Sequence, residues 1–427
     1  MAPALVTGHE ESSLPNESPK RRSRLGAQDF EVKIEDDNTK YPFPPGHAYH
    51  YHTLKKQVLS ANHVYKFLAF LPVGIYAGIF GWNSTAVFVL NLLAIVPLAT
   101  LLSFATEELS ASAGQTVGAL LNATFGNAVE LIVSTIALTK GEIRIVQASM
   151  LGSILSNILL GLGCCIIASS CGQDSYFNAT AASTMSSLMT LVSAALVIPA
   201  ALHLAFGDGQ TENSLKSILT LSRGASIILF VLYILYLNFQ LRTHSRLFEQ
   251  DDTHQQAGSE KNEESNDCRL SPLAAALTIL AATFAIGICS EHLVSTVDDI
   301  VRTLHINKTF IGLIILPVVG NAAEHITAIA AATKGKMGLA LNVAIGSSIQ
   351  IALLITPSLV ILGWAIQQPM SLYFEPFYTV VFFLSVLVVN MLIQDGESNY
   401  FEGSMMVGMY LIIAISFYVY PEKVGGV

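Results

Sequence analysis

Two segments of the chain carry the same polar residues at the same spacing, and these residues are suited to binding a cation. Residues 126–157 and 320–351 align without a gap at a constant offset of 194 positions. Each segment begins with a glycine, an asparagine and, three residues after the asparagine, a glutamate: Gly126, Asn127 and Glu130 in the first, and Gly320, Asn321 and Glu324 in the second. Asparagine and glutamate at this spacing share one face of a helix. Hard cations such as Ca2+ prefer amide and carboxylate oxygens, and two carboxylates neutralise a divalent charge.

Both glutamates are expected near the middle of apolar helices. On insertion scales, a charged side chain at the centre of a membrane costs roughly 2.5–3.5 kcal/mol. A single glutamate there could be a protonated carboxyl that is hydrogen-bonded to a neighbouring helix. Two glutamates at equivalent positions of a repeat favour a functional site. The glycines allow the backbone to break beside them, and Pro317 predicts a kink before Gly320.

The next helix of each segment adds hydroxyl and amide groups. Ser153 and Ser156 are three residues apart, as are Ser347 and Gln350. We predict that Ser153, Ser347 and Gln350 are further ligands. Glycine–serine pairs can equally serve tight helix packing.

Protons can compete with the cation for the same glutamates. Desolvation disfavours the charged form of a buried carboxyl, so an empty pair tends to take up protons. A cation binds only the deprotonated form. This mutual exclusion is the coupling that an antiporter needs.

Three further titratable residues are predicted to lie along an ion pathway. A weaker match between residues 103–112 and 288–296 pairs Glu107 with Glu291, which lie near helix ends on opposite sides of the membrane. These two glutamates could mark the two mouths of the pathway. His325 follows Glu324 directly and could relay protons, or it could be a hydrogen-bonded core histidine.

The composition indicates the elements that position these residues. The 427-residue chain is 52% hydrophobic and 12% charged, whereas soluble proteins carry about 25% charged residues. Its formal net charge of −9 argues against a nucleic-acid partner. The natural partner of such a chain is a lipid bilayer.

Eleven segments are apolar over about the 20 residues that a spanning helix needs. They are approximately 65–82, 84–105, 116–139, 145–170, 183–206, 216–241, 272–293, 309–332, 338–364, 374–393 and 404–420. The predicted fold is therefore an all-α polytopic membrane protein with 11 transmembrane helices. The repeats comprise helices 2–6 and 7–11, with helix 1 outside them. Because five is odd, the two units cross the membrane in opposite senses, which is typical of secondary transporters.

Polar segments divide the chain into four parts. Residues 1–60 form a predicted disordered cytosolic tail, 61–241 hold helix 1 and the first repeat, 242–271 form an acidic cytosolic loop or helix, and 272–427 hold the second repeat. Basic residues before helix 1 place the N-terminus in the cytosol, and eleven spans then place the C-terminus on the lumenal side. The acidic loop could concentrate or sense cations, or it could be a solvated linker. Its acidic residues are Glu249, Asp251, Asp252, Glu260, Glu263, Glu264 and Asp267.

The paired motifs, GNAVELIVSTIAL and GNAAEHITAIAAATKGKMGLALNVAIGSSIQ, closely resemble those of the cation/proton exchanger (CAX) family of the calcium/cation antiporters, especially its fungal vacuolar Ca2+/H+ exchangers. The resemblance covers roughly residues 55–420. It implies that cytosolic Ca2+, with Mn2+ as a further candidate substrate, enters the vacuole in exchange for protons across the vacuolar membrane. It also implies Ca2+ binding by Glu130 and Glu324, helped by the asparagines, serines and glutamine named above. No cofactor besides the transported ions is expected.

Two other transport functions use similar residues. One is a sodium-coupled exchanger on the same scaffold, and the other is a cation channel. An intramembrane enzyme is disfavoured, because the sequence contains no HExxH, GxSxG or phosphate-binding loop.

Overall fold

The computed structural model describes residues 63–170, 174–205, 212–244 and 270–421, all within one compact unit. The described residues are almost entirely helical. Two short strands, β1 (Ser175–Tyr176) and β2 (Glu397–Ser398), form one antiparallel pair. Residues 1–60 of the predicted tail and the acidic residues at 249–267 lie outside the described residues.

The first half of the chain folds into helices that follow the predicted segments closely. They are η1 (His63–Ala69), α2 (Phe70–Ile79), α3 (Ser84–Ser112), α4 (Gln115–Phe125), α5 (Ala128–Thr139), α6 (Ile143–Leu155), η2 (Ser156–Gly161), α7 (Leu162–Ser169), α8 (Ala179–Ala205), α9 (Glu212–Asn238) and η3 (Phe239–Thr243). Here η1 is a 3-10 helix, whereas η2 and η3 are π-helical turns.

The second half repeats much of this order. It comprises α11 (Pro272–Ser295), α12 (Val297–Leu304), α13 (Lys308–Phe310), η4 (Ile311–Ile315), α14 (Leu316–Gly320), α15 (Ala322–Thr333), α16 (Met337–Gln350), η5 (Ile351–Ile355), α17 (Thr356–Ala365), α18 (Pro376–Ile393) and α19 (Tyr400–Val419). The bounds of α5 and α15 differ by the 194 positions that separate the sequence motifs. Each of these helices is followed by a lysine and then by a glycine with positive φ, Gly141 (78°) and Gly335 (75°).

Each of the eleven predicted segments coincides with a helix or a broken helix. By length and apolar composition, eight helices of the described residues can cross a membrane, or nine if a pair bent by 119° counts as one span. The difference from eleven comes from segments that are short or interrupted. Helix 1 is short, at Lys66–Ile79, and the segments at 116–139 and 309–332 each break into two helices.

The breaks occur at the repeated glycine–asparagine pairs. The first interrupts the chain between α4 and α5, and Asn127 has non-helical angles (φ −104°, ψ 29°). The second falls at Asn321, between α14 and α15. Pro317 stands at the start of α14, directly after the π-helical turn η4. A π-turn accommodates the backbone hydrogen bond that a proline cannot donate.

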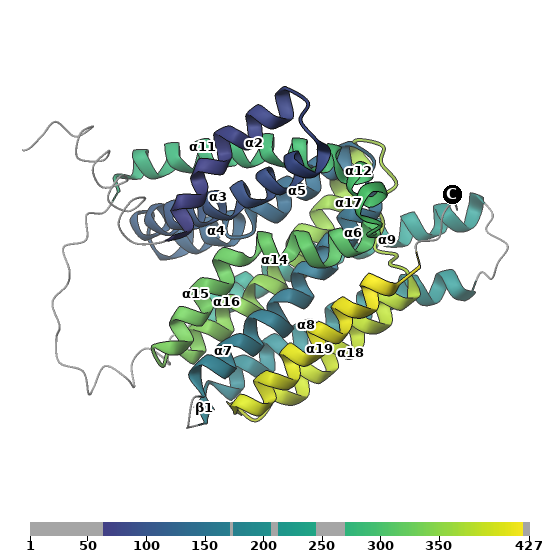
Figure 1. Ribbon diagram of the computed structural model, residues 1–427. Coiled ribbons are helices and arrows are strands. Elements are labelled where there is room, and N and C mark those ends of the chain that lie inside the picture. The colour runs from purple at the N-terminus through teal and green to yellow at the C-terminus, as the bar shows by residue number, and fades with distance from the viewer. Residues whose placement is uncertain (1–62, 171–173, 206–211, 245–269, 422–427) are drawn as a thin grey trace, which may run out of the picture. The chain divides into compact units, whose positions relative to one another are not determined.

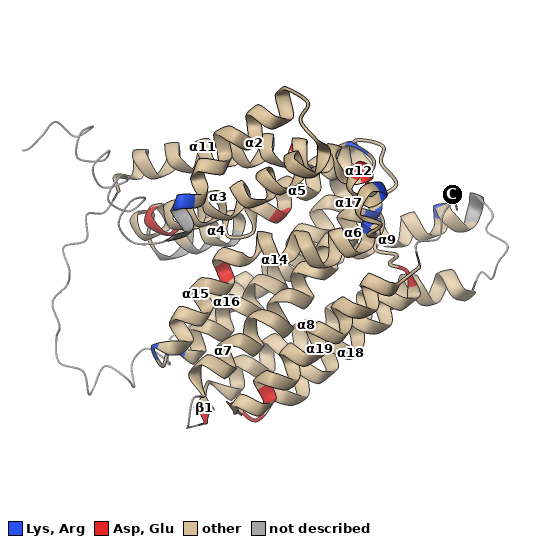
Figure 2. Cartoon of the chain, in the orientation of Figure 1, with Lys and Arg blue, Asp and Glu red and all other residues tan. Residues whose placement is uncertain are grey.

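Helices from the two halves interleave. α3 packs along α11, and α5 packs against α11 (Figure 1). α6 packs against η4. The spans Ile143–Ser169 and Met337–Ala365 are the most buried of the candidate spans. In their most apolar 18-residue stretches, 83% and 67% of the residues are buried inside the protein. Charged residues are sparse along the helices and gather near α12 and at helix ends (Figure 2). The few charges inside therefore stand out as candidates for function.

Candidate cation site

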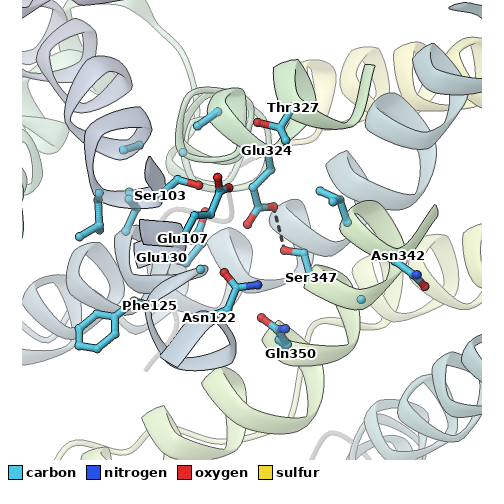
Figure 3. A pocket seen from close by; sticks show the side chains of 18 of the residues that line it. Ser103, Glu107, Asn122, Phe125, Glu130, Glu324, Thr327, Asn342, Ser347 and Gln350 are labelled. Carbon is cyan, nitrogen blue, oxygen red and sulfur yellow. Dashed lines mark hydrogen bonds between the residues drawn. The ribbon is translucent and has the colours of Figure 1, made fainter. Parts of the chain in front are cut away.

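A cavity of about 270 Å³ lies between helices of the two halves. Its walls come from α3, α4, α5, α9, α15 and α16. Seven of the predicted site residues line it: Glu107, Gly126, Glu130, Gly320, Glu324, Ser347 and Gln350. Figure 3 shows Glu130, Glu324 and Glu107 together beside the amide-bearing side chains of Asn122 and Gln350. The structure thus brings the two repeated glutamates to one shared cavity.

The broken helices give both glutamates the same local setting. Glu130 lies in the first turn of α5, and Glu324 lies in the first turn of α15. The N-terminus of a helix carries partial positive charge and favours a carboxylate there. The residue immediately before each helix is an asparagine, but neither Asn127 nor Asn321 uses its side chain to cap the helix. Both amides are therefore available for contacts across the site.

On the Glu324 side, these polar groups form a continuous network. The Ser347 hydroxyl lies 2.8 Å from Glu324 Oε2 and 2.7 Å from Asn127 Oδ1, and its one proton can be donated to only one of them at a time. Asn127 Nδ2 donates to Gln350 Oε1 at 2.6 Å. Asn157 Nδ2 donates to Glu324 Oε2 at 3.3 Å. The network joins α5 and η2 of the first half to α15 and α16 of the second.

The Glu130 side has fewer bonds. Glu130 is 5% exposed, and a Cβ built on Gly320 would lie 3.2 Å from Glu130 Oε1. Glycine at position 320 therefore permits this close approach. A second cavity of about 20 Å³, lined also by Ser149 and Ser153, lies against Glu130. The Ser153 hydroxyl and Asn321 Oδ1 are buried without a hydrogen-bond partner among the described residues, although Asn321 Nδ2 donates to the Ser153 carbonyl at 3.2 Å.

This donor set suits a hard divalent cation. The described residues contain no group of three or more His, Cys, Asp and Glu side chains that could hold a metal. A cation in the cavity would meet two carboxylates together with neutral amide and hydroxyl oxygens. Calcium takes six to eight oxygen ligands in such mixed sets, whereas soft metals prefer thiolate or imidazole.

Comparisons with known proteins identify the family of the chain. Residues 83–242 and 274–419 match the family described as sodium/calcium exchanger protein. The chain belongs to this family. Among its relatives, the vacuolar calcium ion transporter of Schizosaccharomyces pombe is 47% identical over 371 residues, covering 86% of this chain and 88% of the relative. The Ca2+/H+ antiporter of Aphanothece halophytica is 39% identical, over 83% and 95% of the two chains. The crystal structure of the Ca2+/H+ antiporter YfkE matches with a TM-score of 0.68 at 34% identity, over 83% of this chain and 99% of that chain.

Five of the predicted site residues do not line the large cavity. Two are Asn127 and Asn321, whose contacts are described above, and the other three are Ser153, Glu291 and His325. Ser153 faces the small cavity instead. Glu291 forms an ion pair with Lys140 at 2.7 Å, and its side chain is 57% exposed. His325 Nε2 lies 3.0 Å from Asn157 Oδ1, and Asn157 in turn donates to Glu324, so Asn157 links His325 to Glu324. This contact fits a hydrogen-bonded core histidine, and proton relay by His325 stays a prediction.

Sequence reasoning did not single out several residues that the structure adds to the site. Asn157 aligns with Ile351, so a search for repeated polar residues passes over it. Its polarity within an apolar helix was the available signal. Tyr233 and Tyr236 of α9 also line the large cavity, although they are 3% and 6% exposed. Aromatic residues in an apolar helix resemble packing residues, and only tertiary structure places them here.

The two serines of the repeat provide a matched test of this asymmetry. We expect Ser347→Ala to lower the free energy of unfolding by about 1–2 kcal/mol, because it removes the proton that Ser347 donates to either Asn127 Oδ1 or Glu324 Oε2. Ser153→Ala should change it little, because the Ser153 hydroxyl makes no hydrogen bond with the described residues. Thermal unfolding of the two purified variants beside the natural protein measures both effects. Equal losses of stability would contradict the asymmetry.

Proposed function

We propose that this protein is a secondary-active Ca2+/H+ antiporter that moves cytosolic Ca2+ into an acidic compartment by alternating access. One observation carries the proposal: Glu130 and Glu324, at matched positions of the two halves, line a single cavity. The S. pombe relative, named as a vacuolar calcium transporter, supports Ca2+ as the substrate and the vacuolar membrane as the location. The A. halophytica relative and YfkE, both named as Ca2+/H+ antiporters, support exchange for protons.

In this proposal, the carboxylates of Glu130 and Glu324 are the charged ligands of Ca2+. Asn127, Asn321, Ser153, Ser347 and Gln350 supply neutral oxygens, and Gly126 and Gly320 let the halves approach. When Ca2+ leaves, both glutamates take up protons, because bare charges in a closed cavity are costly. The proton-loaded pair can then return across the membrane. Substrates are transported and not chemically converted, so the protein is not an enzyme, and Mn2+ is a candidate second substrate.

The proposed architecture is eleven spans, with helix 1 followed by two inverted five-helix repeats. The coincidence of all eleven segments with helices supports it, as do the shared bounds of α5 and α15. We place the N-terminus in the cytosol and the C-terminus in the lumen. The cavity reaches Glu107 near the end of α3 and Gln240 in η3, shortly before the acidic segment. This topology makes the cavity open toward the cytosol.

Reconstitution of the purified protein tests the function directly. Acid-loaded liposomes that contain the protein should take up external Ca2+ and lose their pH gradient, whereas liposomes loaded with Na+ at neutral pH should not. Uptake driven by the Na+ gradient without proton movement would select a sodium-coupled exchanger, which the family description makes the second candidate. Ca2+ flux far above carrier rates without proton movement would indicate a channel.

A further inference from the structure

One ion pair lies at the end of α5 that is opposite the cavity. Lys140 Nζ contacts Glu291 Oε1 at 2.7 Å and also donates to the Glu291 carbonyl at 3.0 Å. Lys140 follows α5, and Glu291 lies near the end of α11. These two helices pack closely along each other. The pair therefore fastens the first half to the second at the ends of these two helices.

Both partners have counterparts with the same local structure. Lys140 and Lys334 each follow a matched helix and each precede a glycine with positive φ. Glu291 matches Glu107, and each is preceded by a buried hydroxyl residue that bonds back four positions: Ser290 to the Ile286 carbonyl at 2.7 Å and Thr106 to the Leu102 carbonyl at 2.8 Å. The repeat thus supplies a second lysine–glutamate pair at the cavity end.

That second pair is not formed. Lys334 and Glu107, both described residues, make no ion pair with each other, and both are exposed. The cavity lies between their helices: Glu107 and Ser103 of α3 line one wall, and Glu324 and Thr327 of α15 line another (Figure 3). α3 and α15 also pack less closely against each other than α5 and α11 do. The open end of the protein is the end at which the pair is separated.

We propose that Lys140–Glu291 and Lys334–Glu107 are alternating latches. The first pair keeps the far end, which is opposite the cavity, closed while the cavity is open at the near end, where Glu107 lies, as in this structure. The second pair closes the near end in the opposite state. This inference rests on the proposed function, because only a protein that alternates its access needs two such closures. Neither lysine is a ligand of the cation in this scheme.

The far end has an additional closure that the repeat does not copy. Lys308 bridges Asp298 at 2.6 Å and Glu142 at 3.1 Å. The counterpart of Glu142 is Lys336, so the acidic partner that Glu142 supplies to this bridge has no equivalent at the near end. The latches are therefore unequal, and the far-end closure is the stronger one. We expect the state seen here to predominate without ion gradients.

Cross-linking tests the latch in the full-length protein. The five native cysteines are replaced by alanine, and Lys334→Cys is combined with Glu107→Cys in one variant and Lys140→Cys with Glu291→Cys in another. A short bifunctional thiol reagent is applied in liposomes, and linked peptides are identified by mass spectrometry, which needs no transport activity. Single-cysteine variants serve as controls.

We expect the Lys140/Glu291 positions to link without gradients, and the Lys334/Glu107 positions to link during exchange with Ca2+ outside and acid inside. Adding Lys140→Ala should raise the near-end linking yield about two- to fivefold, because an exposed ion pair shifts an equilibrium only modestly. If the far-end pair links but the near-end pair never does, the latch is wrong even where the natural protein exchanges Ca2+ for H+. If the natural protein shows no such exchange, the proposed function itself fails.

Discussion

Glu130→Gln and Glu324→Gln should each abolish Ca2+ uptake and proton release together. Glutamine keeps the shape of the side chain but cannot carry the negative charge or bind the exchanged proton. Removing one partner from a buried charged site costs roughly 3–5 kcal/mol, which corresponds to a loss of about 100-fold or more in rate or affinity. Reconstituted flux, with Ca2+ and pH indicators read in the same vesicles, measures both losses.

The matched control is Glu397→Gln, which removes an exposed carboxylate in β2 far along the chain from the cavity residues. It should exchange at the natural rate. Full exchange by either cavity variant would refute the site. A variant that lost proton coupling but kept Ca2+ flux would show that protons bind elsewhere.

Hydropathy predicted the helices well, because a membrane span needs about 20 consecutive apolar residues, and other kinds of segment are seldom apolar over that length. The ends of α11 and α18 fall within two residues of the predicted ones. The breaks at Asn127 and Asn321 decide how the helices lie, yet glycine in a membrane helix is equally compatible with close packing. The repeated glycines raised the possibility of a break, and the structure locates it. The short helix α12 was not predicted, because its charged residues resemble a loop.

The repeat predicted that Glu130 and Glu324 lie at one cavity, but not how the residues around them bond. Ser153 and Ser347 are equivalent in sequence, and both were predicted as ligands. In the structure, the Ser347 hydroxyl contacts Glu324 and Asn127, whereas the Ser153 hydroxyl has no partner among the described residues. If the cavity opens on one side only, equivalent residues of the two halves must have different contacts in any one conformation. Sequence similarity is therefore unable to predict which half is bonded in a given state.

Two equivalent glycines reveal the same asymmetry through packing. A Cβ built on Gly152 of α6 would lie 2.1 Å from the Leu313 carbonyl oxygen and 2.7 Å from Leu313 Cα, so α6 and η4 would have to separate. Overpacking of this kind costs about 1–3 kcal/mol, and more where the backbone cannot yield. We expect Gly152→Ala to lower the thermal stability of the purified protein strongly.

Gly346→Ala is the matched variant and should have the opposite profile. Gly346 is the counterpart of Gly152 on α16 and lines the large cavity, and a methyl group added to it would have no heavy atom of the described residues within 4 Å, apart from its own helix backbone and chain neighbours. The fold of this variant should therefore be as stable as that of the natural protein, since alanine also favours a helix by up to about 1 kcal/mol over glycine.

If the near end closes during transport as the far end is closed now, the added methyl group must obstruct that closure. Exchange should then slow by about tenfold, which corresponds to roughly 1.4 kcal/mol within the overpacking range. Normal exchange by a stable Gly346→Ala protein would mean that the near end never closes as tightly as the far end, and alternation between equivalent states would have to be abandoned.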